Sequence, residues 1–209
     1  MGNTEPAFAR DPSTAGYYDQ RAAEYDDWYA GLGRFAERER PGWEAELQLL
    51  VDLVASLPPA RTVDIACGTG YLTQHLRGVV VGMDQSRRVV DLTQRRLPHG
   101  VALVGDGLDL PFADGSFHRV VSGHFYGHLP VGERTVFLAE ARRVAPELIV
   151  LDSATRPGVA PEQWQERVLN DGSRHRVFKR YLTGAGLAAE LGGEVLLDGE
   201  WFVAARSTS

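Results

Sequence analysis

The chain has 209 residues, of which 44% are hydrophobic and 24% charged, as is usual for a globular protein with one buried core. Its net charge of −6 argues against nucleic acid as the main partner, because phosphate binding requires clustered Lys and Arg. The single cysteine, Cys67, excludes an intrachain disulfide and a multi-cysteine zinc site. We therefore expect one domain over residues 1–209 without a bound metal.

The sequence predicts neither a membrane span nor a signal peptide. No stretch approaches the roughly 18 consecutive apolar residues of a membrane span. Met1–Arg10 lacks the apolar core that a signal peptide requires. We expect a soluble cytoplasmic protein that needs no membrane.

The N-terminal quarter divides into two parts. Residues 1–16 are polar and contain two prolines, which predicts a flexible arm. Residues 17–60 predict a helical lid and packing region. Tyr18, Tyr25 and Tyr29 fall near one helical face, where they either pack on the core or form a lid whose hydroxyl groups reach a polar ligand. Trp43–Leu57 has the clearest helical spacing, and two prolines end it.

The middle of the chain alternates between short apolar runs and helical patterns. A helix-like pattern also begins at Tyr71, and Ser86 is placed to cap the helix that follows it. Alternation of this kind predicts a doubly wound, Rossmann-like α/β sheet whose strands are mostly parallel. The expected strands are Thr62–Ala66, Val79–Met83, Val101–Val104, Phe117–Ser122 and Leu148–Leu151, with helices over Ser86–Leu97 and Val131–Val144.

The C-terminal quarter departs from this alternation. A helix is expected over Gly184–Leu191, followed by a hairpin of Glu194–Leu197 and Trp201–Ala205 that completes a seven-stranded sheet with an antiparallel end. Ser153–Asp171 predicts irregular structure. The basic segment Ser173–Arg180 is either a solvated face or a surface that holds an acidic substrate.

A glycine turn and three aspartates indicate where a ligand binds. The turn Gly68-Thr69-Gly70 follows the first strand, and Asp64, Asp84 and Asp106 lie at or near the ends of the first three strands. Ligands of parallel sheets bind beyond these carboxyl ends, and glycine lets the backbone approach them closely. The dinucleotide fingerprint is incomplete because Thr73 occupies its third glycine position, which disfavours an NAD-dependent dehydrogenase.

At these residues the sequence resembles the class I S-adenosylmethionine-dependent methyltransferases, in particular the small-molecule branch of ubiquinone and menaquinone biosynthesis C-methyltransferases. Val63–Gly70, Gly82–Ser86, and Gly105–Gly107 with the Leu110–Phe117 stretch resemble three successive motifs of that family. Tyr18-Asp19 and Tyr25-Asp26 resemble its N-terminal helix. One departure is Ala66, where the family more often has glycine.

The resemblance implies that S-adenosylmethionine is the cofactor and assigns roles to individual residues. Asp84 would accept from the ribose hydroxyls, Asp106 from the adenine amino group, and Asp64 would face the methionine amino group. The full set of implied cofactor-binding residues is Tyr18, Tyr25, Asp64, Ala66, Cys67, Gly68, Asp84, Gln85, Asp106, Gly107, Leu108, Ser122 and His124. For a single aspartate, a turn or N-cap role would be the simpler interpretation.

The acceptor side is less defined by the sequence. His128 and Tyr126 are candidate bases just past the fourth strand, and Trp164, Arg167 and Tyr181 are candidate substrate contacts. The implied activity is methylation of a small molecule on O, C or N by a monomer or homodimer. The alternative is a non-methylating cofactor-binding protein or a biosynthetic cyclase on the same fold.

Overall fold

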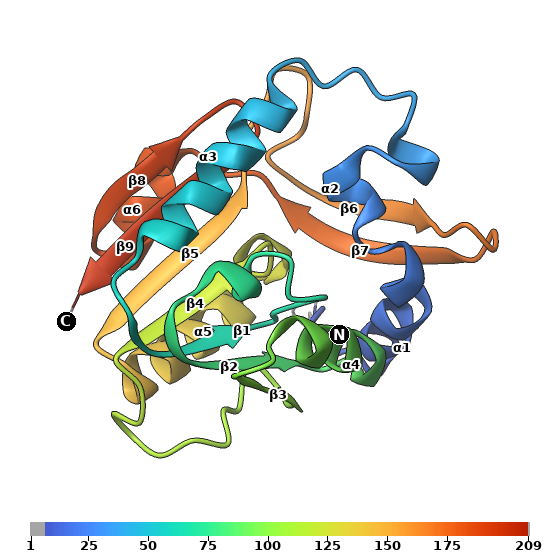
Figure 1. Cartoon of the computed structure of the whole chain (residues 1–209). Helices are drawn as coiled ribbons and strands as arrows, with labels where there is room; N and C mark the ends of the chain where they lie inside the picture. The colour runs from blue at the N-terminus through green and yellow to red at the C-terminus, as the bar shows by residue number, and fades with distance from the viewer. Residues whose placement is uncertain (1–6, 209) are drawn as a thin grey trace, which may run out of the picture.

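The structure, a computed structural model, describes residues 7–208. Its centre is a seven-stranded sheet in the order β3-β2-β1-β4-β5-β9-β8, in which β9 runs antiparallel to both of its neighbours, β5 and β8 (Figure 1). The predicted doubly wound sheet with an antiparallel C-terminal hairpin is therefore confirmed. Its strands are β1 (Ala60–Ile65), β2 (Gly78–Asp84), β3 (Val101–Val104), β4 (Arg119–Gly123), β5 (Glu147–Ser153), β8 (Glu194–Asp198) and β9 (Phe202–Thr208).

Six α-helices in the described chain surround this sheet. Two agree with the predicted bounds, and Ser86 caps a third by accepting from the Val89 N–H at 3.4 Å, as expected. The helices are α1 (Pro12–Arg21), α2 (Asp27–Ala30), α3 (Trp43–Ser56), α4 (Arg87–Arg96), α5 (Val131–Val144) and α6 (Gly184–Leu191).

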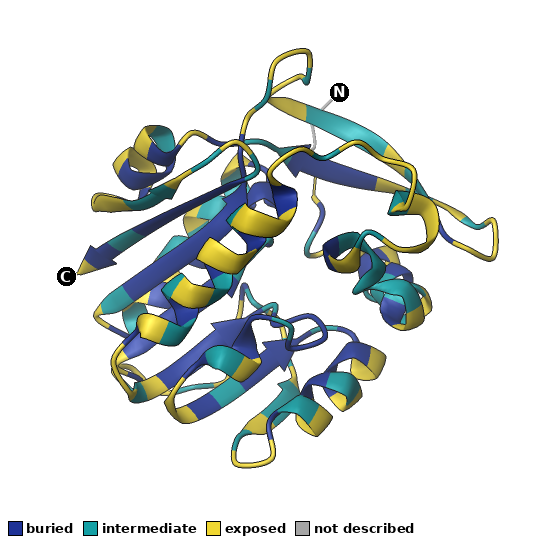
Figure 2. Cartoon of the chain, turned by 45° about the horizontal axis from the view of Figure 1, so that its top comes forward, coloured by how far each residue is buried: buried dark blue, intermediate teal, exposed yellow. Residues whose placement is uncertain are grey.

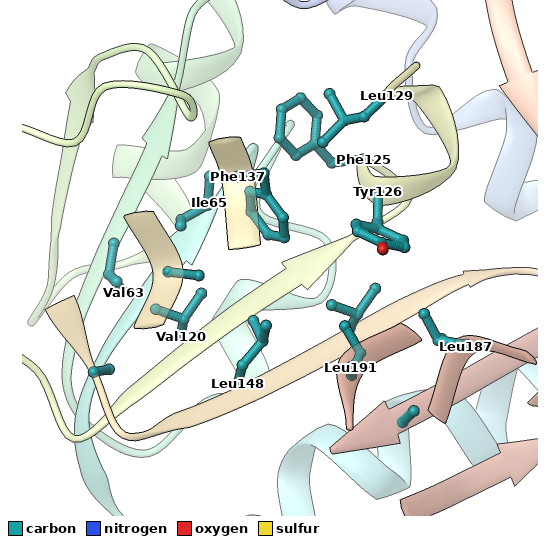
Figure 3. Close-up of a cluster of buried hydrophobic side chains, with 14 of the residues drawn as sticks. Val63, Ile65, Val120, Phe125, Tyr126, Leu129, Phe137, Leu148, Leu187 and Leu191 are labelled. Atoms are coloured by element: carbon teal, nitrogen blue, oxygen red, sulfur yellow. The ribbon is translucent and has the colours of Figure 1, made fainter. Parts of the chain in front are cut away.

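Alternate side chains of the central strands supply two separate cores. On β5, Leu148 and Val150 pack toward α5 and α6, whereas Ile149 and Leu151 pack toward α3. Figure 3 shows the first of these clusters, and Figure 2 shows that buried strands lie beneath helices whose outer faces are exposed. A parallel sheet covered on both faces requires such continuous apolar strands, and only its strand ends remain free for polar chemistry.

The expected helix after the glycine turn is wrong. Residues 66–77 contain a single 3₁₀ turn, Thr73–His75, before β2 begins. Leu72 and Leu76 are buried in the core that α3 fills. Because α3 covers this face of the sheet, the two leucines close the remaining space without a further helix.

The expected flexible arm is also wrong for its described part. Phe8 is buried, and the backbone N–H groups of Phe8, Ala9 and Arg10 donate to the carboxylate of Glu133 on α5 at 3.0–3.2 Å. Asp11 then caps α1 through the Ser13 N–H. The polar composition of this segment predicted flexibility, but the Glu133 carboxylate accepts the backbone hydrogen bonds that hold the segment in place. Residues 1–6 of the predicted arm lie outside the described residues.

The segment after β5 is more regular than expected. β6 (Glu162–Val168) and β7 (Arg174–Arg180) pair as a separate antiparallel hairpin. Phe8 and Tyr17 share a buried cluster with Val177 and Phe178 of this hairpin. The N-terminal helices and the hairpin thus lie together on one side of the sheet (Figure 1). None of the helices in residues 7–208 has the length and hydropathy needed to cross a bilayer.

Candidate functional site

A pocket lies beyond the carboxyl ends of β1, β2 and β3, on the side where the strand order reverses between β1 and β4. We refer to it as the strand-end pocket; it contains about 470 Å³ of space partly open to solvent. Most of the residues around it were predicted from the sequence. Its lining is Ala9, Tyr18, Tyr25, Ala66, Asp84, Gln85, Gly105, Asp106, Gly107, His124 and Phe125.

Asp84 is fixed at the centre of this pocket. One carboxylate oxygen accepts from the Gly68 N–H at 3.0 Å and the other from the Ser86 N–H at 2.9 Å. Burial raises the pKa of Asp84 to about 6, against the effect of these hydrogen bonds. Since an ionised carboxylate can accept about four hydrogen bonds, this group can accept further ones from a diol.

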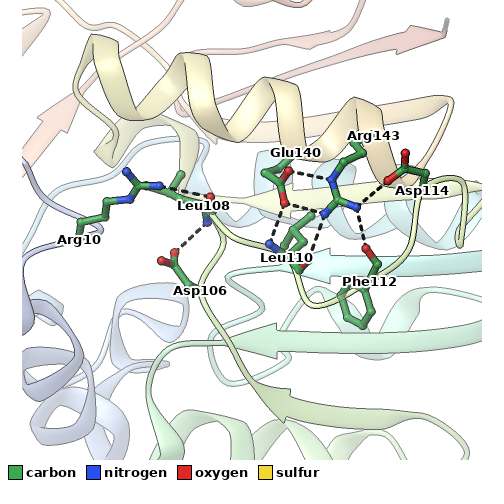
Figure 4. Close-up of polar contacts among 8 residues, drawn as sticks. All are labelled: Arg10, Asp106, Leu108, Leu110, Phe112, Asp114, Glu140 and Arg143. Carbon is green, nitrogen blue, oxygen red and sulfur yellow. Dashed lines mark hydrogen bonds and ion pairs between the residues drawn. The ribbon is translucent and has the colours of Figure 1, made fainter.

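Asp106 is held by the loop that follows β3. Its carboxylate accepts from the Leu108 N–H at 2.8 Å, and the Leu108 carbonyl accepts from Arg10 (Figure 4). Farther along, the Arg143 guanidinium donates to the carbonyls of Leu110 and Phe112. These contacts restrain the loop, so Asp106 lines the pocket in a defined position.

The turn after β1 has an unusual backbone. Ala66 has a φ of +58°, in the left-handed region that glycine adopts readily. The alanine therefore adopts a backbone conformation that glycine takes without strain. Gly68 also has a positive φ, and a Cβ atom there would lie 2.9 Å from the Tyr25 hydroxyl. This close approach explains why residue 68 must be small.

Asp64 lies beside the strand-end pocket and lines a smaller cavity that shares Tyr25 and Ala66 with it. One of its carboxylate oxygens accepts from the Thr73 hydroxyl at 2.6 Å, and the other is buried without a partner. Burial raises its pKa to about 7. An unpartnered buried carboxylate oxygen is rare and suits a cationic ligand group.

A second, larger cavity of about 1130 Å³, partly open to solvent, adjoins the first. Tyr25 and His124 line both. We call it the arginine cleft, after the cations that surround it: Arg21, Arg38, Arg40, Arg156, Arg167 and Lys179. Aromatic rings form much of its remaining wall, namely Trp28, Tyr29, Phe35, Trp43, Tyr181 and Trp201.

His124 stands at the junction of the two cavities. Its φ is +56°, and neither ring nitrogen has a hydrogen-bond partner although both are buried. The ring packs edge-on against Trp28, with centroids 4.8 Å apart. Burial lowers the pKa of His124 to about 4, so the imidazole is neutral at physiological pH.

His128 faces the arginine cleft from the turn after β4. Its Nδ1 lies 2.6 Å from the Phe178 carbonyl oxygen, and its ring stacks on Phe8 at 5.3 Å. A carbonyl only accepts, so Nδ1 carries the hydrogen and Nε2 is the acceptor. Burial and the nearby Lys179 ammonium hold the pKa of His128 well below its usual range.

Five of the predicted site residues line none of the three cavities: Tyr126, Gly68, Leu108, Ser122 and Trp164. The Tyr126 hydroxyl donates to Glu190 at 2.7 Å, and its ring is buried in the core between α5 and α6 (Figure 3). Leu108 is buried in the same core, and Ser122 donates to the Ile65 carbonyl. Trp164 packs on Phe178, outside the arginine cleft. By contrast, Arg167 and Tyr181 line that cleft, and Cys67 lines the small cavity next to Asp64.

Several lining residues were not predicted. Ala9 and Arg156 come from segments without a motif, whereas Arg21 and Trp28 lie beside the tyrosines that resemble the family's N-terminal helix. The sequence did offer evidence for one buried pair, because Lys179 is the only lysine of the chain and Asp152 directly follows a predicted strand. Their ion pair is 2.7 Å long. Burial alone would raise the pKa of Asp152, but Lys179 and two nearby histidines have the larger, opposite effect and lower this pKa to about 2.

Comparison with known proteins agrees with this geometry. A family model described as a methyltransferase domain matches residues 63–147. The demethylmenaquinone methyltransferase of Thermotoga maritima is 31% identical over 100 residues, covering 46% of this chain and 43% of that protein. The enzyme of the same name from Renibacterium salmoninarum is 33% identical over 138 residues, covering 65% and 55%. The matched regions thus span about half the length of these relatives.

Solved structures extend the likeness to nearly the whole chain. The DhpI–SAM–HEP complex matches with a TM-score of 0.76 at 24% identity, covering 94% of this chain and 96% of that one. The DhpI–SAH complex matches with a TM-score of 0.71 at 25% identity, covering 93% and 94%. The likeness in fold therefore extends well beyond residues 63–147, which the family model matches.

Proposed function

Because the chain belongs to the class I S-adenosylmethionine-dependent methyltransferases, we propose that it transfers a methyl group from S-adenosylmethionine to a small-molecule acceptor. The proposal locates the cofactor in the strand-end pocket and the acceptor in the arginine cleft. It takes the chain as one domain of a cytoplasmic monomer or homodimer. The buried, unpaired Cys67 is compatible with a reducing compartment.

The residues present fit this cofactor. Asp84 would accept from the ribose hydroxyls and Asp106 from the adenine amino group, with Gln85 alongside. Asp64 carries the observation on which the proposal depends, because its buried, unpartnered oxygen lies next to the pocket and would face the methionine ammonium group. Tyr18 and Tyr25 close the pocket from α1 and the turn after it.

When bound, S-adenosylmethionine supplies an electrophilic methyl group on a sulfonium centre. The chain's own contribution is positioning, since Tyr25 and His124 form the shared wall between the two cavities. His128 presents an unprotonated Nε2 to the arginine cleft and would take a proton from an acceptor that has one to lose. Tyr126 has no part in this proposal because its hydroxyl is bound to Glu190.

Calorimetric titration with S-adenosylhomocysteine tests the cofactor site. We expect binding that Asp84→Ala weakens by at least roughly tenfold, as for loss of a charge-assisted hydrogen bond. Asp91→Ala is the control, because Asp91 is an exposed residue of α4 paired with Arg87. Absence of binding to the unaltered protein would refute the proposal.

A non-methylating cofactor-binding protein or a cyclase remains the second candidate. It would bind S-adenosylhomocysteine equally well, so binding alone does not separate the two. Incubation with S-adenosylmethionine and a panel of metabolites, followed by mass spectrometry, does so. A product heavier by one methylene unit supports methyl transfer, and consumption of a metabolite without that gain supports the alternative.

A further inference from the structure

The arginine cleft has a charge imbalance that contrasts with the rest of the chain. The protein has a net charge of −6, yet six cationic side chains line this one cavity and Glu39 is the only carboxylate residue among its lining residues. Lys179 is neutralised by Asp152 beneath it. The five arginines therefore determine the electrostatic character of the cleft.

These five arginines lack the carboxylate partners that half of the other arginines have. Within residues 7–208, none of them has a carboxylate within 4.0 Å, whereas eight other arginines form ion pairs. Arg21 donates to the Tyr17 hydroxyl and Arg40 to the Trp28 carbonyl, both neutral groups. The guanidinium groups of Arg156 and Arg167 donate no hydrogen bond to any other described residue, although the backbones of both residues take part in a turn and in β6.

Aromatic rings position four of the guanidinium groups instead. Arg156 lies 4.5 Å from the Trp201 ring centroid, and Arg40 lies 4.1 Å from that of Trp43. Arg21 and Arg38 lie over Tyr25 and Phe35 at 4.6 and 4.8 Å. Stacking orients a guanidinium but leaves its charge uncompensated and its N–H edges free. The cleft is thus prepared for an anion that the chain does not supply.

We propose that the arginine cleft binds the methyl acceptor through an oxyanion group, a carboxylate or a phosphonate, held chiefly by Arg156 and Arg167. This inference rests on the proposed function, because the cleft meets the cofactor pocket at Tyr25 and His124. Guanidinium forks match both oxyanions with paired hydrogen bonds. The aromatic walls suit a substrate whose remaining body is apolar or planar.

Fragments that differ only in charge test this inference. Protein saturated with S-adenosylhomocysteine is titrated calorimetrically with benzoate, phenylphosphonate, benzamide and benzylamine. We expect both anions to bind at least roughly tenfold more tightly than the neutral amide, and the amine not to bind. A difference between the two anions identifies which oxyanion the cleft prefers. Benzamide binding as tightly as the anions would overturn the inference.

Variants locate the anion within the cleft. Arg156→Gln and Arg167→Gln are each expected to weaken anion binding by roughly tenfold. Arg176→Gln is the matched control, because Arg176 also stacks on a ring, that of Trp164 at 4.9 Å, but lies outside the cleft. Equal weakening by all three variants would contradict the inference.

The same titrations separate this inference from the proposed function. All three variants should retain their affinity for S-adenosylhomocysteine, which also shows that they fold. Failure of the unaltered protein to bind S-adenosylhomocysteine would count against the proposed function. Intact S-adenosylhomocysteine binding without anion preference would count against the oxyanion inference alone.

Discussion

The strand-end pocket and the arginine cleft are neighbours built on opposite principles. In the pocket, carboxylates at strand ends are fixed by backbone N–H groups, as Asp84 is by Gly68 and Ser86. In the cleft, arginines are positioned by aromatic rings and have no carboxylate partner. The pocket is therefore rigid and negatively charged, whereas the cleft is positively charged and its cations are only partly satisfied. This difference suits a cationic ligand group in the pocket and an anionic one in the cleft.

The largest effect is expected beneath the cleft, where Lys179 and Asp152 join β7 to β5. Both side chains are buried, and their ion pair is 2.7 Å long. Lys179→Met leaves Asp152 as an uncompensated buried charge, which we expect to destabilise the fold by about 3–5 kcal/mol. Urea unfolding monitored by tryptophan fluorescence measures this change.

The pH dependence of that loss has a defined sign. Asp152 has a depressed pKa of about 2, so its contribution to stability is present above the unfolded value of 3.8 and is lost as the pH falls toward 2. Without the lysine, Asp152 would take up a proton at a higher pH, and the stability gap should narrow as the solution is acidified. Arg174→Met is the control on the same strand, because its pair with Glu166 is exposed. Equal losses in the two variants would contradict the prediction.

Gly68→Ala is expected to distort the strand-end pocket in addition to straining the backbone. The added Cβ would lie 2.9 Å from the Tyr25 hydroxyl at a positive φ, so the phenol must shift. We predict roughly tenfold weaker binding of S-adenosylhomocysteine by calorimetry. Gly115→Ala provides the control, since Gly115 has a φ of +62° but open space around it. That variant should lose stability by about 1 kcal/mol and keep its affinity.

Asp64 predicts how cofactor binding depends on pH. With a pKa raised to about 7, its carboxyl group is half protonated near neutrality, and a bound ammonium group would favour the ionised form. Affinity for S-adenosylhomocysteine should therefore fall by up to about tenfold per pH unit below that pKa, with proton release on binding. Asp64→Asn should bind more weakly and lose this part of the pH dependence. A pH profile unchanged by the substitution would show that Asp64 does not face the ammonium group.

The same contrast explains what the sequence could predict. The strand ends that line the pocket lie within residues 66–107, where Asp84 and Asp106 come at the end of apolar strands and parallel strands bring their carboxyl ends together. Short-range patterns therefore located Asp84, Asp106 and Gln85. They did not reveal which way Tyr126 points, because adjacent residues of a turn face different directions and only packing against Glu190 decides between them.

The cleft is assembled from segments far apart in the chain, from Arg21 to Trp201. Its cations depend on tertiary contacts that leave no local pattern, as the stacking of Arg156 on Trp201 illustrates. Similarly, the backbone of Phe8–Arg10 is held by Glu133, about 125 residues away. Arg167 and Tyr181 were named as candidates because they lie near a basic segment of the sequence. The β6–β7 hairpin, which contains Arg167 and ends just before Tyr181, was not predicted.

The smallest effect is expected at Ala66. The turn holds its backbone in the left-handed region, which the Cβ atom of an alanine disfavours. A non-glycine residue at φ +58° costs about 1 kcal/mol, so Ala66→Gly should raise stability by up to that amount after the greater entropy of the unfolded glycine is subtracted. Ala102→Gly on β3 is the control, because a strand residue without positive φ should only lose stability. Urea unfolding of both variants tests this. A loss of stability at both positions would mean that the turn already accommodates the alanine without strain. This turn is held by hydrogen bonds from the Gly68 N–H to Asp84 and from the Cys67 N–H to the Met83 carbonyl.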